Sequence, residues 1–144
     1  SVAILTPGVN AFRRLRKNLT EPVFNSWGYN TRSAALRIPC SDESNRRIEY
    51  RLAGADANPY LVVATILTGM LYGLEHIDEG DLPEPQHDQP ELPLFQQEAI
   101  EAFARCQYLT DSLGDAFSEQ WVACKLSELD WFERIVTQEE SHLA

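Results

Sequence analysis

The pattern of apolar and polar positions divides the chain into a strand-rich first part and a helical last part. Three short segments of the first part are rich in β-branched and aromatic residues, and turn formers such as Gly28 and Asn30 separate them. They cover residues 23–27, 33–38 and 47–52. The pattern predicts a small antiparallel β-meander.

Polar and apolar side chains alternate with a period of two in the third segment. Arg47, Glu49 and Arg51 fall on one face, and the apolar residues that alternate with them fall on the other. We therefore expect one face of this strand to pack on a core and the other to carry ionic groups.

Asn58 and Pro59 predict the start of a helix. An Asn side chain caps free backbone N–H groups, and Pro at the first helical position loses no hydrogen bond. We expect this helix to run to about Glu75. Its apolar residues surround it on nearly all sides, which indicates burial in a core or an interface.

The last third shows two apolar stripes with helical spacing, over residues 94–107 and 117–138. The first stripe contains Phe95, Ala99, Ala102, Phe103 and Cys106, and the second contains Trp121, Cys124, Leu129, Phe132 and Val136. We expect the two segments to pack as a helical hairpin, with the stripes in the core.

Residues 78–93 separate the two parts of the chain. They contain four prolines and six acidic residues, a composition that does not form regular structure and that is typical of a solvated linker. The predicted organisation is α+β, with a strand-rich part that includes the first long helix (residues 1–77), the linker (78–93) and the helical part (94–144).

Composition excludes several classes of protein. With 144 residues, of which 44% are hydrophobic, the chain can bury a core, and no apolar stretch approaches the roughly 20 residues of a transmembrane helix. A net charge of −10 argues against binding to nucleic acid. Three widely spaced cysteines, without a visible export signal, fit a reducing compartment. We expect a cytoplasmic protein that binds neither nucleic acid nor membranes.

The charge is distributed unevenly. The first 51 residues carry nine basic and four acidic side chains, whereas the remainder carries three basic and eighteen acidic ones. Eight of the nine early basic residues are arginine, which suits planar, bidentate contact with carboxylates and phosphates. Two interpretations remain open: these arginines bind a small anion, or they pair with the acidic remainder of the chain.

Arg32, Arg37, Arg47 and Arg51 lie on adjacent predicted strands, close to the single carboxylate of Glu49. Burying so much like charge without an anion is costly, so the cluster predicts a phosphate or carboxylate ligand. Arg32 and Arg37 are five positions apart and do not share a face, which places Arg32 in a turn. Glu49 has two interpretations, as a structural ion-pair partner or as a ligand of Mg²⁺.

Four segments of this region resemble a known family. In order, they are Thr31-Arg32-Ser33-Ala34, Leu36-Arg37-Ile38-Pro39, Arg46-Arg47-Ile48-Glu49-Tyr50-Arg51 and residues 54–61, Gly-Ala-Asp-Ala-Asn-Pro-Tyr-Leu. Together they resemble the C-terminal part of the catalytic domain of class I glutamine synthetases, over roughly residues 8 to 75. Residues 26–28 and 54–56 are most similar to the gamma-glutamylpolyamine synthetase branch.

The resemblance implies a partial glutamine synthetase catalytic domain, one incomplete domain overall, from an ATP-dependent ligase. Such an enzyme phosphorylates the side-chain carboxylate of glutamate, and ammonia or a primary amine then displaces the phosphate to form a γ-amide. The implied cofactors are ATP and Mg²⁺ or Mn²⁺, and the implied assembly is a homo-oligomer. The alternative is a noncatalytic glutamine-synthetase-like module for nucleotide binding or assembly.

The resemblance also implies roles for individual residues. Arg14 and Arg51 match residues that bind glutamate, Arg32, Arg37 and Arg47 match residues that contact the nucleotide and its phosphates, and Glu49 matches a metal ligand. Arg32 is also implied in catalysis, at the transferring phosphoryl group. These roles suit phosphoryl transfer, which is catalysed mainly by positioning and charge compensation.

The sequence departs from the family pattern at two positions. The catalytic glutamate of the family's flap aligns with Thr20, and Glu21 follows one place later, so that the role is either kept by Glu21 or lost. Thr31 replaces the usual Asn before Arg32, a change that we expect to be mild.

The family's other metal-binding carboxylates and its metal-binding histidine precede the matched region. His76, His87 and His142 do not align with that histidine. We therefore expect the C-terminal fragment of a longer enzyme, inactive on its own and completed by the rest of the parent domain.

Overall fold

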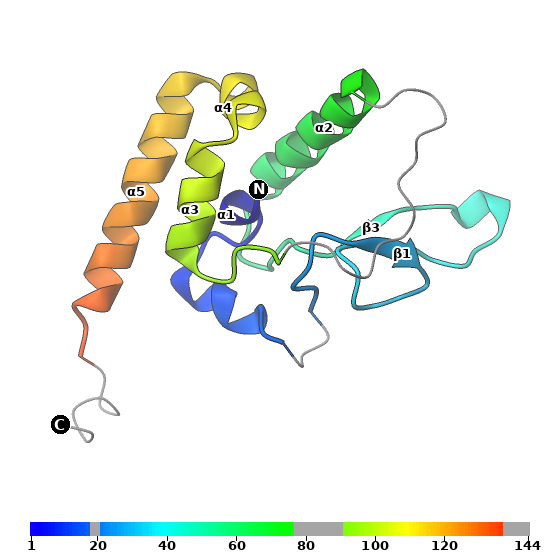
Figure 1. Cartoon of the computed structure of the whole chain (residues 1–144), viewed down its shortest axis with the longest axis horizontal. Helices are drawn as coiled ribbons and strands as arrows, with labels where there is room; N and C mark the ends of the chain where they lie inside the picture. Colours follow the sequence, from blue (N-terminus) through cyan, green and yellow to red (C-terminus); the bar gives the residue numbers. More distant parts are fainter. Residues whose placement is uncertain (18–20, 77–90, 137–144) are drawn as a thin grey trace.

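The structure, a computed structural model, describes residues 1–17, 21–76 and 91–136 and combines helices with a small sheet (Figure 1). The helices are α1 (Val2–Leu5), α2 (Pro59–His76), α3 (Gln96–Ala104), α4 (Gln107–Leu113) and α5 (Asp115–Glu133), with the 3-10 helices η1 (Val9–Arg14) and η2 (Glu43–Asn45). The strands are β1 (Trp27–Tyr29), β2 (Leu36–Ile38) and β3 (Glu49–Tyr50). The predicted α+β class is confirmed.

The sheet has the order β1-β2-β3, but it is not the predicted antiparallel meander. Strand β2 pairs antiparallel with β3 and parallel with β1, with Gly28 opposite Arg37. The loop between β1 and β2 does not simply reverse the chain, because Ala34 and Ala35 at its end are buried. Ala35 packs with Leu5 and Leu52, so the loop returns to the start of β1 before β2 begins.

Helix α2 begins where the sequence predicts. It starts at Pro59, and the side-chain oxygen of Asn58 accepts a hydrogen bond from the Tyr60 backbone N–H at 3.0 Å. At its other end, the Tyr108 hydroxyl of α4 donates to Glu75 at 2.7 Å, and this bond raises the pKa of Tyr108 to about 12.

Burial of α2 in a core, the first of the two predicted alternatives, is wrong for the described part of the chain, and burial in an interface stays a prediction. Thr65 is its only buried residue there, and seven large apolar side chains are roughly half to more than four-fifths exposed. They are Tyr60, Val63, Leu67, Met70, Leu71, Tyr72 and Leu74. The reason is geometric: α1 and α4 pack against this helix, whereas its apolar residues occupy nearly its whole circumference.

The helical part forms the predicted hairpin, with a short helix inserted at its tip. Helices α3 and α5 run in opposite directions side by side, and α4 connects them (Figure 1). The predicted stripes are only partly buried. Ala99 and Phe103 are fully buried, whereas Phe95 precedes α3, Cys106 lies between α3 and α4, and both are exposed. A residue outside the helix does not follow its period, which explains both errors.

The second stripe is also only partly buried, and the same reason applies to Val136 at its end. Trp121, Leu129 and Phe132 of α5 are half-buried, whereas Cys124 is exposed and Val136 lies beyond the last helical residue with 73% of its surface exposed. None of the helices in the described ranges has the length and hydropathy that a membrane-spanning helix needs.

The main core lies where α1, η1 and α3 meet. It contains Val2, Ala3, Ile4, Phe12, Leu15, Ala99, Phe103 and Leu109. A second cluster, of Leu5, Ala35 and Leu52, joins α1 to the sheet and thereby fixes the segment that follows β3. Residues 78–90 of the predicted linker (78–93) lie outside the described residues, as do Thr20, His87 and His142.

Candidate functional site

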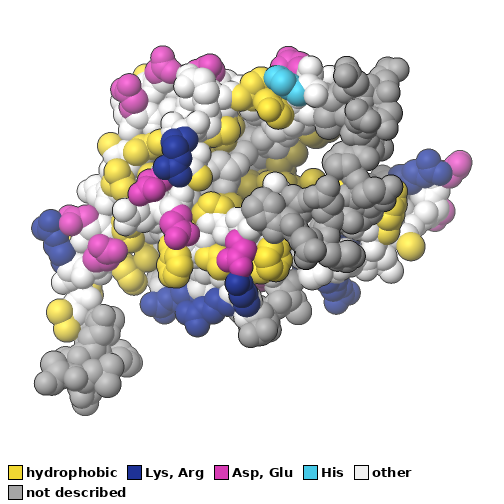
Figure 2. Space-filling model, viewed as in Figure 1, with side chains coloured by type: hydrophobic (Ala, Val, Ile, Leu, Met, Phe, Trp, Pro, Cys, Tyr) yellow, Lys and Arg dark blue, Asp and Glu magenta, His cyan; other side chains and the backbone are white. Residues whose placement is uncertain are grey.

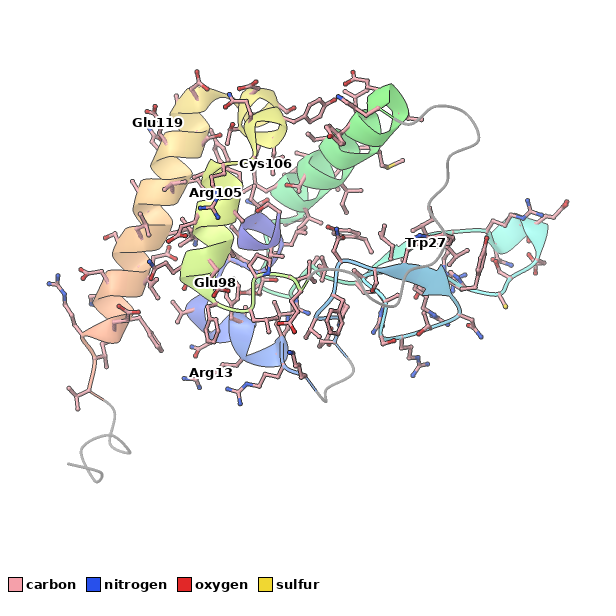
Figure 3. All side chains as sticks on the ribbon, in the orientation of Figure 1. Arg13, Trp27, Glu98, Arg105, Cys106 and Glu119 are labelled. Carbon is pink, nitrogen blue, oxygen red and sulfur yellow. The ribbon has the colours of Figure 1, made fainter. Side chains whose placement is uncertain are left out.

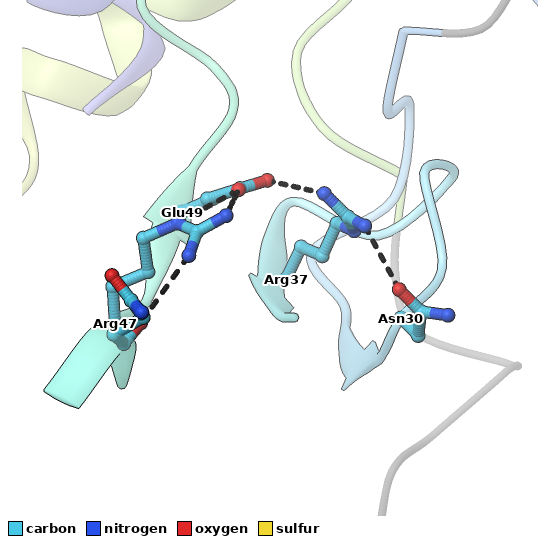
Figure 4. Close-up of polar contacts among 5 residues, drawn as sticks. Asn30, Arg37, Arg47 and Glu49 are labelled. Carbon is cyan, nitrogen blue, oxygen red and sulfur yellow. Dashed lines mark hydrogen bonds and ion pairs between the residues drawn. The ribbon is translucent and has the colours of Figure 1, made fainter. Parts of the chain in front are cut away.

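Arg37 and Glu49 form the centre of an ionic cluster across the antiparallel pair β2–β3. The two residues are direct partners in the sheet register, and Arg37 Nη1 donates to Glu49 Oε2 at 2.7 Å (Figure 4). Arg37 Nη2 donates to the side-chain oxygen of Asn30 at 2.9 Å. Only 18% of the Arg37 side chain is exposed, so this guanidinium is held firmly within the sheet surface.

Arg47 joins the cluster from the segment before β3. Its Nε donates to Glu49 Oε1 at 3.2 Å, and its Nη1 donates to the backbone oxygen of Asn45 at the same distance. The predicted common face of Arg47 and Glu49 is therefore confirmed. Both oxygens of Glu49 accept from a guanidinium, which is the arrangement expected of an ion-pair partner.

The hydrogen bond from Arg37, with a further contribution from Arg47, holds the pKa of Glu49 below its ordinary value of 4.5. A carboxyl group with a lowered pKa in the folded state stabilises the fold above that ordinary value. The contribution is lost as the pH falls through the folded-state pKa.

We therefore expect Glu49→Gln to flatten the loss of stability between pH 6 and pH 3. The neutral amide has no proton to take up, so the variant starts less stable and loses less on acidification. Urea unfolding midpoints measured across this range test the prediction. Glu43→Gln is the matched control, because the Glu43 side chain is 91% exposed. Equal slopes for wild type and Glu49→Gln would contradict the prediction.

A second ionic group surrounds Arg14 at the end of η1. Arg14 donates to the hydroxyl of Thr6 at 3.3 Å and to the backbone oxygen of Leu52, and it pairs with Glu21 at 3.2 Å. The Thr6 hydroxyl itself donates to Leu52 O at 3.2 Å. The structure thus brings the two predicted site residues Arg14 and Glu21 together, and Arg14 also contacts Leu52, which follows Glu49 by three residues.

The neighbouring arginine has different surroundings. Arg13 is exposed on η1 and lies at the lower edge of the molecule, away from the sheet that carries Trp27 (Figure 3). Figure 2 shows basic side chains along this lower edge and acidic ones mainly over the helical part. Only Arg14 of this pair is directed toward the segment that follows β3.

The other two predicted arginines are not in contact with Glu49. Arg32 lies exposed in the β1–β2 loop, which confirms its predicted place in a turn. The Arg51 backbone N–H donates to Ala35 O at 2.9 Å, and its side chain is half-buried. Across the described ranges, no hydrogen bond or ion pair joins Glu49 to either of them.

Three arginines retain donors that fit an anion. Arg14 Nε, Arg37 Nε and Arg51 Nη1 are buried and have no hydrogen-bond partner among the described residues. Buried donors without partners are rare because each costs free energy, and a bound carboxylate or phosphate would satisfy them. The donor set therefore fits anionic groups of the carboxylate or phosphate type.

The described residues do not fit a complete metal site. They contain no group of three or more His, Cys, Asp or Glu side chains that could hold a metal ion. Mg²⁺ requires near-octahedral oxygen coordination, and here Glu49 is the one carboxylate in contact with Arg37 and Arg47. The role of Glu49 as a metal ligand stays a prediction.

Sequence reasoning missed two residues of these groups. The sequence indicated Asn30 only as a turn former, although its side chain accepts a hydrogen bond from Arg37. It did not indicate Thr6, whose hydroxyl donates to Leu52 O and accepts from Arg14. The available signal for Asn30 was its residue type, since Asn tolerates left-handed backbone conformations at the end of a strand.

The buried arginine donors indicate a protein that binds phosphate or carboxylate groups, and comparison with known proteins narrows this broad class. The family model described as "Glutamine synthetase, catalytic domain" matches residues 1–143. The chain belongs to the glutamine synthetase family.

Among the curated relatives, gamma-glutamylputrescine synthetase PuuA of Escherichia coli (strain K12) is 43% identical over 97% of this chain and 30% of its own length. Glutamine synthetase of Pyrococcus woesei is 31% identical over 99% of this chain and 34% of its own. Lengsin of Mus musculus is 36% identical over 88% of this chain and 24% of its own length. The chain therefore spans about a quarter to a third of the length of these relatives.

A solved structure has the same fold. The structure titled "Apo GmaS without ligand" superposes with a TM-score of 0.79 and 28% identity, over 98% of this chain and 34% of that one. The predicted resemblance to a partial glutamine synthetase catalytic domain is confirmed by this match and by the family model.

Proposed function

We propose that this chain supplies glutamate- and phosphate-binding arginines to an ATP-dependent ligase that joins the side-chain carboxylate of glutamate to ammonia or a primary amine. The observation that carries the proposal is the set of buried guanidinium donors on Arg14, Arg37 and Arg51 that have no hydrogen-bond partner within residues 1–17, 21–76 and 91–136. Membership of the glutamine synthetase family supports the reaction class.

Each arginine has a proposed part. Arg14 and Arg51 bind carboxylates of glutamate, and Arg37 and Arg47, with Arg32 from the exposed loop, bind the phosphates. ATP supplies the phosphoryl group and leaves as ADP. The guanidinium groups compensate the negative charge on the transferring oxygens, and they do so best when they are already fixed, as Arg37 is by Glu49 and Asn30.

The second step forms the amide. The amine nitrogen attacks the carbonyl carbon of the phosphorylated glutamate, phosphate leaves, and the nitrogen loses a proton. Glu21 is the proposed proton acceptor, and its pairing with Arg14 keeps its carboxylate beside the proposed glutamate site. No step is assigned to a metal ion, and Glu49 is proposed as at most one of its ligands.

The acceptor is proposed to be an amine larger than ammonia. Identity to gamma-glutamylputrescine synthetase is 43%, against 31% to glutamine synthetase of Pyrococcus woesei. The full-length enzyme is proposed to be cytoplasmic and to assemble as a homo-oligomer.

The test is ATP-dependent phosphate release by the full-length polypeptide that contains this chain, with glutamate and Mg²⁺. Putrescine, a monoamine and ammonium are compared, and the 144-residue chain alone serves as the inactive control. Release with putrescine or the monoamine is the expected result. Release with ammonium alone would assign a glutamine synthetase, and no release with any of the three would favour a noncatalytic module.

A further inference from the structure

Asn30 has a backbone conformation that no other non-glycine residue in the described ranges adopts. Its φ angle is +51°, in the left-handed region. Most L-residues avoid this region because of steric repulsion, and Asn is among the few that occupy it readily. Such outliers tend to occur where the surrounding structure requires them, and often at functional sites.

The backbone of Asn30 ends the parallel pair of strands. Its N–H donates to Ile38 O at 2.8 Å, immediately after the last register pair of Tyr29 with Ile38. The chain then leaves the sheet for the loop that carries Arg32. The left-handed conformation therefore sits at the exit from the sheet.

The side chain of Asn30 completes the fixation of Arg37. Its oxygen accepts from Arg37 Nη2 at 2.9 Å, while Glu49 holds Nη1 from the opposite side at 2.7 Å (Figure 4). Two of the three guanidinium nitrogens are thus tied to separate partners. The third, Nε, is buried and has no hydrogen-bond partner in the part of the chain that the structure describes. This geometry fixes the plane of the guanidinium and leaves Nε as a donor.

We propose that Asn30 is a positioning residue that holds the Arg37 guanidinium in the orientation needed to meet the phosphate groups of the nucleotide. The proposal rests on the proposed function of Arg37. It assigns Asn30 no contact with the substrate, since the amide acts through Arg37 alone. A planar guanidinium that is fixed before the reaction needs no reorganisation when charge develops.

Asn30→Gly separates positioning from a structural role. Glycine adopts the left-handed conformation without strain, so the variant removes the side-chain contact and leaves the backbone free to keep its shape. We expect kcat for phosphate release by the full-length polypeptide to fall at least about tenfold, which is the order expected for a lost hydrogen bond to a charged group. The melting temperature should not fall, and KM for glutamate should stay within about twofold.

Asn30→Asp is the conservative variant, because Asp also tolerates this conformation and offers an oxygen at the same place. It should retain kcat within about threefold. Asn25→Gly is the matched control, since Asn25 is exposed nearby and makes no side-chain hydrogen bond in the described part of the chain. A kcat for Asn30→Gly within twofold of wild type, or a parallel loss of melting temperature, would overturn the proposal.

A double-mutant cycle with Arg37→Ala tests the route of the effect. If Asn30 acts through Arg37, Asn30→Gly should change the Kd of a non-hydrolysable ATP analogue in the wild type and leave it unchanged in Arg37→Ala. Additive effects would overturn the proposal. Because the cycle measures binding, it tests the role of Asn30 even when no amine supports turnover. Absence of turnover would contradict only the proposed function. Absence of analogue binding to the wild-type polypeptide would overturn both.

Discussion

Replacing Arg37 with alanine is expected to lower ATP-dependent phosphate release by the full-length polypeptide at least about 10³-fold, the scale reported for arginines that compensate charge in phosphoryl transfer. The substitution removes the guanidinium that Glu49 and Asn30 fix, and no other described arginine contacts both. Arg37→Lys should recover little, because a single ammonium does not reproduce the planar fork. Steady-state assays that report kcat and KM for ATP separately check this.

Arg46→Ala is the matched control for Arg37→Ala. Arg46 directly precedes Arg47, but its side chain is 74% exposed and its ion pair with Glu43 spans 3.5 Å. Exposed pairs of this kind contribute little, so activity should stay within about twofold. Comparable losses in both variants would show that general positive charge, and not the fixed geometry of Arg37, supports the reaction.

The second large effect concerns stability. Phe103 is 0% exposed and belongs to the main core with Ile4, Phe12 and Leu109. Phe103→Ala should lower the free energy of unfolding by about 3–5 kcal/mol, because it removes buried apolar surface and leaves a cavity that neighbours fill only in part. Guanidinium chloride unfolding of the 144-residue chain, followed by circular dichroism, measures the change.

Phe95→Ala provides the control with identical chemistry. Phe95 is 68% exposed at the N-terminal end of α3, where its side chain makes no capping hydrogen bond. Its removal should change the free energy of unfolding by less than about 0.5 kcal/mol. If the two variants differ by less than about 1 kcal/mol in the free energy of unfolding, the assignment of Phe103 to the main core is contradicted.

Features determined by neighbouring residues could be predicted from the sequence. The start of α2 follows from the capping chemistry of Asn58 and Pro59, which act within one turn of the helix. The position of Arg32 in a loop follows from its spacing to Arg37, and the face shared by Arg47 and Glu49 follows from the period of a strand. Each of these depends on no more than six consecutive residues.

Features determined by contacts between distant residues could not be predicted from the sequence. The loop that leads into the parallel pairing of β1 and β2 buries Ala35 against Leu5 and Leu52, which are distant in the sequence, and no local pattern predicts that contact. The exposure of α2 illustrates the same limit: its apolar circumference indicates that it needs cover, but not which elements provide it. The anchoring of Arg37 by Asn30 joins residues whose proximity depends on strand pairing.

One short segment connects the two ionic groups. Glu49 holds Arg37 and Arg47, and Leu52 O accepts from Arg14. Between them, the Arg51 backbone N–H donates to Ala35 O, just beyond the paired ends of β2 and β3. Three residues of extended chain span about 10 Å, and inserting or deleting one would change that by about 3.3 Å. The length of the segment thus sets the distance between the arginines proposed for phosphate and those proposed for glutamate, and the buried Leu52 side chain fixes its far end.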